Sequence, residues 1–311
     1  MRTKTLSFVL ALVCAFSFGS CSKRSGAPVS GGALGAKKSI VVTYSVLGSV
    51  VRELVGDDFE VKVSIPNGLD VHEWEPSAKD IENINKADLV VVNGIGLEGG
   101  MQKTLNQAKA AGVKFFTASD HIAVRHVGAG EGIPSGDPDQ AIGAADPHLW
   151  TNPLIMKSVV DALAVELKAD FGTDYSAKAA EIDGKLDALD AQIKADVAAL
   201  PQDRRKLVTG HESLGYFAQA YGFKLVGAVV PGLSSDAETS AAELSSLKKL
   251  IADNGVSVIF TEIGTPKQVV EALAKETGAK TVQLGTHALP ADGSYYSFER
   301  ELAETIVKGL K

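Results

Sequence analysis

Hydrophobic and polar positions follow one another along the first half of the chain in short blocks. Continuous apolar runs such as SIVVTYS and ADLVVVN are typical of buried strands, and an alternating run is typical of a half-buried strand. The strands predicted from these runs are at residues 39–45, 60–65, 87–93 and 113–117. Helical stretches lie between them, at residues 46–55, 76–85 and 101–111.

The second half of the chain repeats this scheme. Strands are predicted at residues 206–210, 224–230, 256–262 and 280–285, and helices at 214–221, 237–254, 266–277 and 296–310. Alternating strands and helices of this size predict parallel sheets with helices on both faces. The pattern therefore predicts an α/β fold of two lobes, each with a four-stranded, mostly parallel sheet flanked by helices.

One long helix is predicted between the two lobes, at residues 175–200. Its apolar residues recur at three- and four-residue steps from Ile182 to Val197, and Pro201 ends it. At 1.5 Å per residue such a helix is about 37 Å long, enough to run along both lobes. The predicted organisation is an N-terminal lobe at 39–172, a linking helix at 173–201 and a C-terminal lobe at 202–311.

The N-terminus has the features of an export signal. Arg2 and Lys4 precede an apolar run, and small residues then lead to Cys21. A cysteine at that position resembles a bacterial lipobox, in which Cys21 would carry the lipid that anchors the protein to a membrane. We predict a signal peptide at residues 1–21 and a flexible tether at 22–38. Ordinary secretion, without lipid on Cys21, is the alternative.

Composition narrows the class of ligand. A net charge of −7 argues against nucleic acid, because no basic face compensates the phosphates. No apolar run after Cys21 approaches the roughly 20 residues that cross a bilayer. The other cysteine, Cys14, leaves with the signal peptide, so a metal site in the mature chain must be built from His, Asp or Glu.

Four histidines follow predicted strands or short turns, two in each half of the chain. They are His72, His148, His211 and His287. Ligands of open α/β folds bind beyond the carboxyl ends of the strands, so these side chains are expected to meet between the lobes. Four neutral imidazoles suit Zn²⁺, which favours four tetrahedral ligands. Glu262 points at the same edge, as a partner of an imidazole N–H or as a weak further ligand.

Two other motifs resemble enzyme signatures but do not fit them. Residues 94–99 (GIGLEG) match a dinucleotide-binding fingerprint, but they follow the third predicted strand rather than the first strand of a βαβ unit. His211 and Glu212 begin a zinc-protease H-E-x-x-H motif, but Gly215 stands where the second histidine belongs. The sequence therefore favours neither a dehydrogenase nor a zinc protease.

Several longer stretches resemble one known family. The matching stretches include GLDVHEWEPSAKDI, ADLVVVNGIGLE, DPHLWTNP, TGHESLGYFAQAYGF and DGSYYSFEREL. They resemble the zinc- and manganese-binding solute-binding proteins of bacterial ABC transporters, and the resemblance covers residues 39–311. It implies two α/β lobes joined by a long helix, with the metal in the cleft. It also implies ligands at His72, His148 and His211, the third of these being typical of zinc binders.

The fourth ligand departs from the family pattern. The family usually has Asp there, and this chain has His287, which removes a negative charge and disfavours Mn²⁺ relative to Zn²⁺. Asp292 or Glu262 is the alternative fourth ligand. With four imidazoles, the metal charge must be balanced by carboxylates further out; the candidates are Glu73, Glu75, Asp146 and Glu262.

The resulting hypothesis is an exported zinc receptor without enzymatic activity, located in the periplasm or at the cell surface. Zn(II) is the transported ligand, and the partner is an ABC transporter permease with its ATPase. We expect a monomer, and acid should weaken zinc binding because imidazoles ligate only when neutral. The alternatives are a manganese or iron receptor of the same fold and a zinc hydrolase. An additional role as an adhesin stays open.

Overall fold

The first half of the chain forms one parallel sheet of four strands. The computed structural model describes residues 37–132 and 141–311. The strands are β1 (Ser39–Tyr44), β2 (Glu60–Ile65), β3 (Leu89–Val92) and β4 (Phe115–Thr117), in the order β2-β1-β3-β4. All four residues of β3 are buried, as its continuous apolar sequence predicts. The loops that follow β2 and β4 carry His72 and His148.

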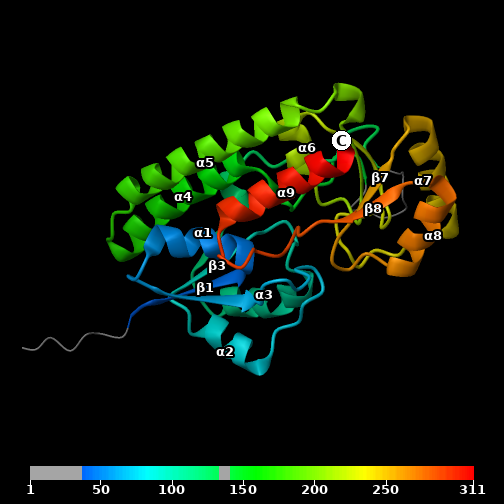
Figure 1. Ribbon diagram of the computed structural model, residues 1–311. Coiled ribbons are helices and arrows are strands. Elements are labelled where there is room, and N and C mark those ends of the chain that lie inside the picture. Colours follow the sequence, from blue (N-terminus) through cyan, green and yellow to red (C-terminus); the bar gives the residue numbers. More distant parts are fainter. Residues whose placement is uncertain (1–36, 133–140) are drawn as a thin grey trace, which may run out of the picture. The chain divides into compact units, whose positions relative to one another are not determined.

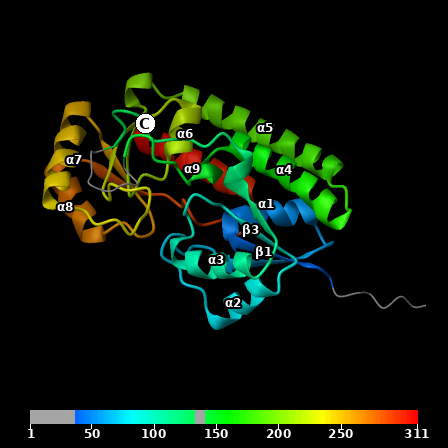
Figure 2. The same ribbon diagram turned by 180° about the vertical axis from the view of Figure 1, so that it is seen from behind.

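Helices cover the sheets and bridge the two halves of the chain (Figure 1). They are α1 (Ser45–Val55), α2 (Ala78–Asn85), α3 (Gln102–Ala110), α4 (Pro153–Phe171), α5 (Ser176–Ala198), α6 (Gly215–Tyr221), α7 (Ala241–Asn254), α8 (Lys267–Thr277) and α9 (Tyr295–Leu310). The predicted long helix is confirmed as α5, with 23 residues. It packs along both α4 and α9, and Figure 2 shows the same arrangement from behind.

The second half departs from the predicted four-stranded sheet. Its strands β5 (Lys206–Thr209), β6 (Lys224–Ala228), β7 (Val258–Thr261) and β8 (Lys280–Gln283) form two parallel pairs, β5-β6 and β7-β8. Strands β5 and β7 are neighbours without a backbone ladder. Just beyond β5, the Gly210 N–H donates to the carboxylate of Glu262 at 3.2 Å.

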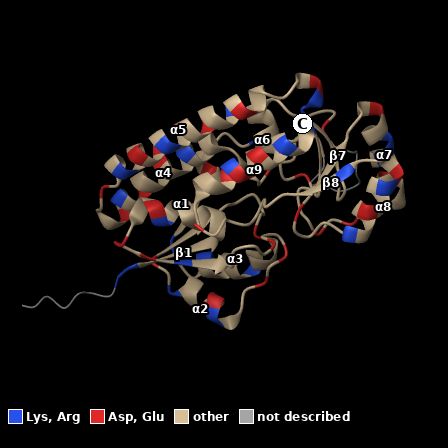
Figure 3. Cartoon of the chain, viewed as in Figure 1, with Lys and Arg blue, Asp and Glu red and all other residues tan. Residues whose placement is uncertain are grey.

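The predicted export signal, with Cys21, lies outside the described residues, as does the tether up to residue 36. Charged residues in the described part gather on exposed helices such as α5, α7 and α8 (Figure 3). None of the helices described combines the length and hydropathy that a membrane crossing requires.

Candidate metal centre

The four histidines singled out in the sequence come together in one buried group. A potential ligand atom from each of His72, His148, His211 and His287 lies within 4.8 Å of the others. All four side chains are nearly inaccessible, with exposed fractions of 4% or less. Two come from loops of the first half and two follow β5 and β8, so loops from both halves of the chain deliver nitrogen donors to one point.

Two spacings within the group match those of tetrahedral zinc coordination. Two Zn–N bonds of about 2.0–2.1 Å at a tetrahedral angle hold their nitrogens about 3.3–3.4 Å apart. The Nε2 atom of His148 lies 3.3 Å from Nε2 of His72 and 3.2 Å from Nε2 of His211. Three of the imidazoles therefore aim the same ring nitrogen at a common centre.

His148 is oriented by a chain of buried charges. The Oδ1 atom of Asp146 accepts from both the backbone N–H and the Nδ1–H of His148, each at 2.9 Å. Oδ2 of Asp146 pairs with Nη1 of Arg125 at 3.0 Å, and Arg125 pairs in turn with Glu131. A proton held on Nδ1 leaves the Nε2 lone pair free, which is the arrangement that favours metal ligation.

His211 has a comparable partner in Glu262. Its Nδ1 lies 3.3 Å from Oε2 of Glu262. The carboxylate also accepts from the hydroxyls of Ser213 at 2.7 Å and Thr286 at 2.8 Å. Burial raises the pKa of Glu262, and these donors act against that rise. Glu262 therefore lies behind a histidine, in the partner role that its position after a strand suggests.

His287 differs from its neighbours, since neither of its ring nitrogens has a hydrogen-bond partner within the described structure. Burial lowers the pKa of His287 to about 3, with repulsion from His148 as the lesser cause. Burial likewise holds the pKa values of His72 and His211 well below the usual range. A buried polar group without a partner is costly, and a cation at the centre of the group would supply one.

The turn that carries His72 requires glycines on a neighbouring loop. The carbonyl of His72 accepts from the Gly100 N–H at 2.9 Å. A Cβ at Gly99 would lie 2.8 Å from that carbonyl oxygen, and one at Gly100 would overlap the carbonyl of Trp74. These glycines, at the end of the apparent dinucleotide fingerprint and just after it, thus allow close backbone approach behind a histidine.

Gly215 likewise has a packing explanation. A Cβ at this position would overlap both Oδ2 of Asp146 and the guanidinium of Arg125. The second histidine of a zinc-protease motif has no room there. The residue that breaks the H-E-x-x-H pattern is therefore the one that lets α6 pack on the Asp146–Arg125 pair.

The predicted carboxylates differ in how close they lie to the histidine group. Asp146 and Glu262 are buried beside the group, whereas Glu73 and Glu75 are exposed. Asp292 is exposed near the start of α9, where it accepts from Ser294 N and Ser297 Oγ. The structure brings Asp146 and Glu262 close enough to balance a dication, and it does not bring Asp292 into the histidine group.

Sequence reasoning missed Arg125 and the hydroxyl donors to Glu262, because their partners lie far away in the chain. Sequence reasoning also missed Asp70, although a local signal for it existed. Both Asp70 and Asp146 stand two residues before a histidine, and each accepts that histidine's backbone N–H at 2.9 Å. The repeated D-x-H pattern is thus a turn that fixes the histidine backbone.

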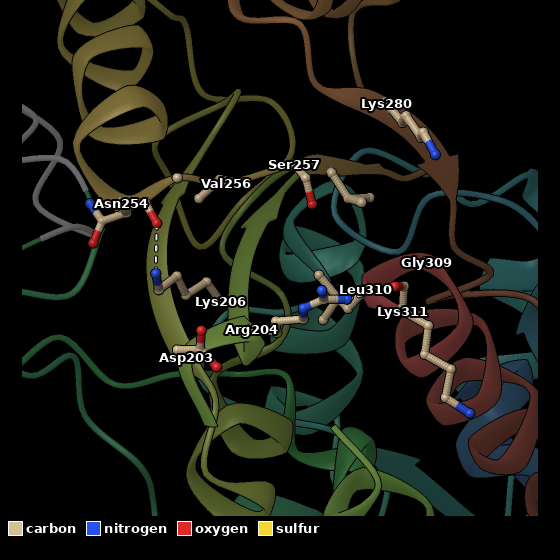
Figure 4. Close-up of a pocket in the computed structure, with 12 residues that line it drawn as sticks. Asp203, Arg204, Lys206, Asn254, Val256, Ser257, Lys280, Gly309, Leu310 and Lys311 are labelled. Atoms are coloured by element: carbon tan, nitrogen blue, oxygen red, sulfur yellow. Dashed lines mark hydrogen bonds between the residues drawn. The ribbon is translucent and has the colours of Figure 1, made fainter. Parts of the chain in front are cut away.

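One surface cavity lies away from the histidine group. It has a volume of about 440 Å³ and is lined by residues such as Lys206, Asn254 and Lys280 (Figure 4). Lys206 and Lys280 begin β5 and β8, whereas His211 and His287 follow the other ends of these strands. Lys206 there donates to the carbonyl of Asn254 at 2.6 Å. The cavity presents lysine and arginine side chains, and Asp203 is its one acidic side chain, so it does not provide a ligand set for a metal.

Comparisons with known proteins find similar chains among zinc- and manganese-binding transport proteins. The family model described as zinc-uptake complex component A, periplasmic, matches residues 40–309. The high-affinity zinc uptake system protein ZnuA of Bacillus subtilis is 31% identical over 259 residues, with 81% of this chain and 79% of that protein covered. The manganese ABC transporter substrate-binding lipoprotein PsaA of Streptococcus pneumoniae is 28% identical, with 99% of each covered. The solved structure of the periplasmic zinc-binding protein TroA from Treponema pallidum superposes with a TM-score of 0.75 at 25% identity, covering 88% of this chain and 99% of that one.

Proposed function

The chain belongs to the family of zinc-uptake complex component A, and from this premise we propose that it captures Zn(II) outside the cytoplasm and delivers it to an ABC transporter permease. The family consists of solute-binding components of metal importers, not of enzymes. The proposed ligands are His72, His148, His211 and His287. Zn(II) is the transported substrate, bound and released unchanged.

The observation that carries the choice of zinc is the all-nitrogen donor set. Hard cations such as Mn²⁺ prefer carboxylate oxygens, whereas imidazole suits zinc. No carboxylate is among the four grouped ligand atoms, in a search confined to the described residues. Asp146 and Glu262 would balance the two positive charges from behind His148 and His211. This arrangement supports zinc over manganese.

A manganese or iron receptor of the same fold is the second candidate, because several relatives are named as manganese proteins. Direct competition separates the two. Protein loaded with equal concentrations of Zn²⁺ and Mn²⁺, then desalted, should retain about one equivalent of zinc by elemental analysis. Retention of manganese in preference to zinc would contradict the proposal.

The proposed location is a bacterial membrane surface, through a lipid on Cys21. Support comes from the export-type N-terminus and from relatives named as lipoproteins. Mass spectrometry of the protein from bacterial membranes should find a diacylglyceryl group on Cys21, and Cys21→Ala should release the protein from the membrane fraction. We also propose that the chain divides into two lobes, at 39–172 and 202–311, on either side of the linking helix. We further propose that the protein is a monomer.

A further inference from the structure

The two D-x-H turns of the metal centre use their aspartates differently. In the second turn, Oδ1 of Asp146 holds the His148 ring, and Oδ2 pairs with Arg125. In the first turn, Oδ1 of Asp70 accepts only the backbone N–H of His72, at 2.9 Å. Its Oδ2 accepts from the hydroxyl of Ser235, 165 residues further along the chain, at 2.7 Å.

Ser235 belongs to a segment that also holds the neighbour of His211. The carbonyl of Gly232 in this segment accepts from the Glu212 N–H at 2.9 Å. Residues 229–233 and Ser235 are buried, although no regular element contains them. The segment at 229–236 therefore runs from the backbone beside His211 to the turn that carries His72.

A second loop closes around the same contact. Gly264 has φ +85°, and a Cβ there would lie 2.8 Å from Oδ2 of Asp70 and 3.4 Å from Cβ of Ser235. The turn at Gly264 follows β7 and lies two residues beyond Glu262, the partner of His211. The Asp70 carboxylate is thus enclosed by two segments that both connect to His211.

His287 is attached to the first half more extensively. The Asn67 side chain donates to the Leu289 carbonyl at 2.9 Å and accepts from the Leu289 N–H at 2.7 Å. The Trp150 indole donates to the carbonyl of Thr286 at 2.9 Å. In contrast, within residues 37–132 and 141–311, the Asp70–Ser235 bond is the one hydrogen bond between the His72 turn at 66–76 and the 229–236 segment.

We infer that Asp70 is a positioning residue, and that its hydrogen bond with Ser235 acts as a latch that holds His72 and His211 together and so slows metal release. The inference rests on the proposed zinc-binding function. Opening this latch frees the His72 turn from the 229–236 segment without removing a ligand, and it leaves the bonds of Asn67 and Trp150 to the His287 loop in place.

Two neighbouring serines provide a matched test. Ser235→Ala removes the latch donor, whereas Ser234→Ala removes a bond to Asp236 that stays within the same loop. Zinc transfer to an excess of chelator, followed by stopped-flow absorbance, gives the dissociation rate. Loss of a hydrogen bond to a charged group predicts release about tenfold faster for Ser235→Ala. Ser234→Ala should release zinc within about twofold of the unaltered protein.

A measurement without metal tests the latch independently of zinc. In the metal-free protein, amide hydrogen exchange in peptides that cover 229–236 should be faster for Ser235→Ala than for Ser234→Ala. Equal exchange in the two variants would overturn the latch. Unaltered protein that takes up no zinc in an equilibrium titration would overturn the proposed function instead. Zinc uptake with equal release rates in all three proteins would overturn the latch alone.

Discussion

The two histidines from the second half of the chain lie in contrasting surroundings. His211 is backed by Glu262, which is itself held by two hydroxyls and a backbone N–H. His287 is equally buried, but neither of its ring nitrogens has a partner in the described structure. One imidazole is oriented before metal arrives, and the other is held only by packing and by the backbone of its loop.

The contrast shows that two similar ligands can contribute to metal binding in different ways. A carboxylate behind an imidazole fixes the tautomer and increases its basicity, so the metal finds a ready donor. An imidazole without partners is destabilising in the metal-free protein and becomes satisfied only when metal binds. His211 is therefore oriented for metal binding in advance, whereas a ring nitrogen of His287 gains a partner only when metal binds.

The largest expected effect comes from removing the oriented ligand. His211→Ala leaves Glu262 buried without its imidazole and removes one of four donors. Structural zinc sites are worth about 10–16 kcal/mol in total, so one ligand accounts for roughly 3 kcal/mol, or about 10²–10³-fold in affinity. Competition titration with a zinc chelator measures this loss. His126→Ala, at an exposed histidine, is the control and should bind as before.

The second test replaces the unpartnered ligand by a carboxylate. His287→Asp introduces a hard oxygen donor and a negative charge, so Mn²⁺ should gain on Zn²⁺ by at least about tenfold. Affinities for the two metals, measured in parallel by calorimetry, give the ratio. An unchanged ratio, together with unchanged zinc affinity in His287→Ala, would remove His287 from the ligand set.

A smaller loss of zinc affinity than that of His211→Ala is expected when the carboxylate behind His211 is changed. Glu262→Gln keeps the size of the side chain but removes its charge, and changes of this kind typically cost 10- to 100-fold in metal affinity. Glu73→Gln, at an exposed carboxylate beside His72, is the matched control. Equal zinc affinities for these two variants would mean that Glu262 has no electrostatic role.

Acid should destabilise the metal-free protein through the same buried imidazoles. Burial lowers the pKa values of His72 and His211, and that of His287 to about 3, so the unfolded chain binds more protons than the folded one below about pH 6.5. Stability is complete above that pH and is lost as pH falls toward the lowered values. Each histidine contributes at most about 1.4 kcal/mol per pH unit. Burial also raises the pKa of Glu212 to about 8, which acts in the opposite direction, so urea unfolding at pH 7, 6 and 5 compares the metal-free protein with metal-free His287→Leu. Equal slopes for the two proteins would contradict the burial of a neutral imidazole at His287.

Local patterns predicted the parts of this molecule that depend on neighbouring residues. The apolar run of β3 and the spacing of α5 predicted both elements with small errors at their ends. The placement of the four histidines after strands predicted that they meet, and the structure groups them, because parallel strands end at a common edge.

Long-range pairing limited the rest. The second four-stranded sheet was wrong, since strand sequences do not reveal which strands form a backbone ladder, and here β5 pairs with β6 and β7 pairs with β8. The pairing of Arg125 with Asp146 spans 21 residues across a loop that has no periodic pattern. Such contacts depend on the folded backbone, so sequence periodicity carries no record of them.

The smallest expected effect separates stability from binding at His287. His287→Leu replaces a buried group without hydrogen-bond partners by an apolar side chain of similar size. Removing an unsatisfied buried polar group stabilises a protein by about 1 kcal/mol, which raises the thermal midpoint of a chain this large by roughly 2–4 °C. The metal-free variant should therefore unfold at a higher temperature while its zinc affinity falls. His211→Leu lacks this gain, because Glu262 loses its imidazole partner. Calorimetry of both metal-free variants makes the comparison, and equal shifts of the two midpoints would mean that the histidines do not differ in the way their contacts indicate.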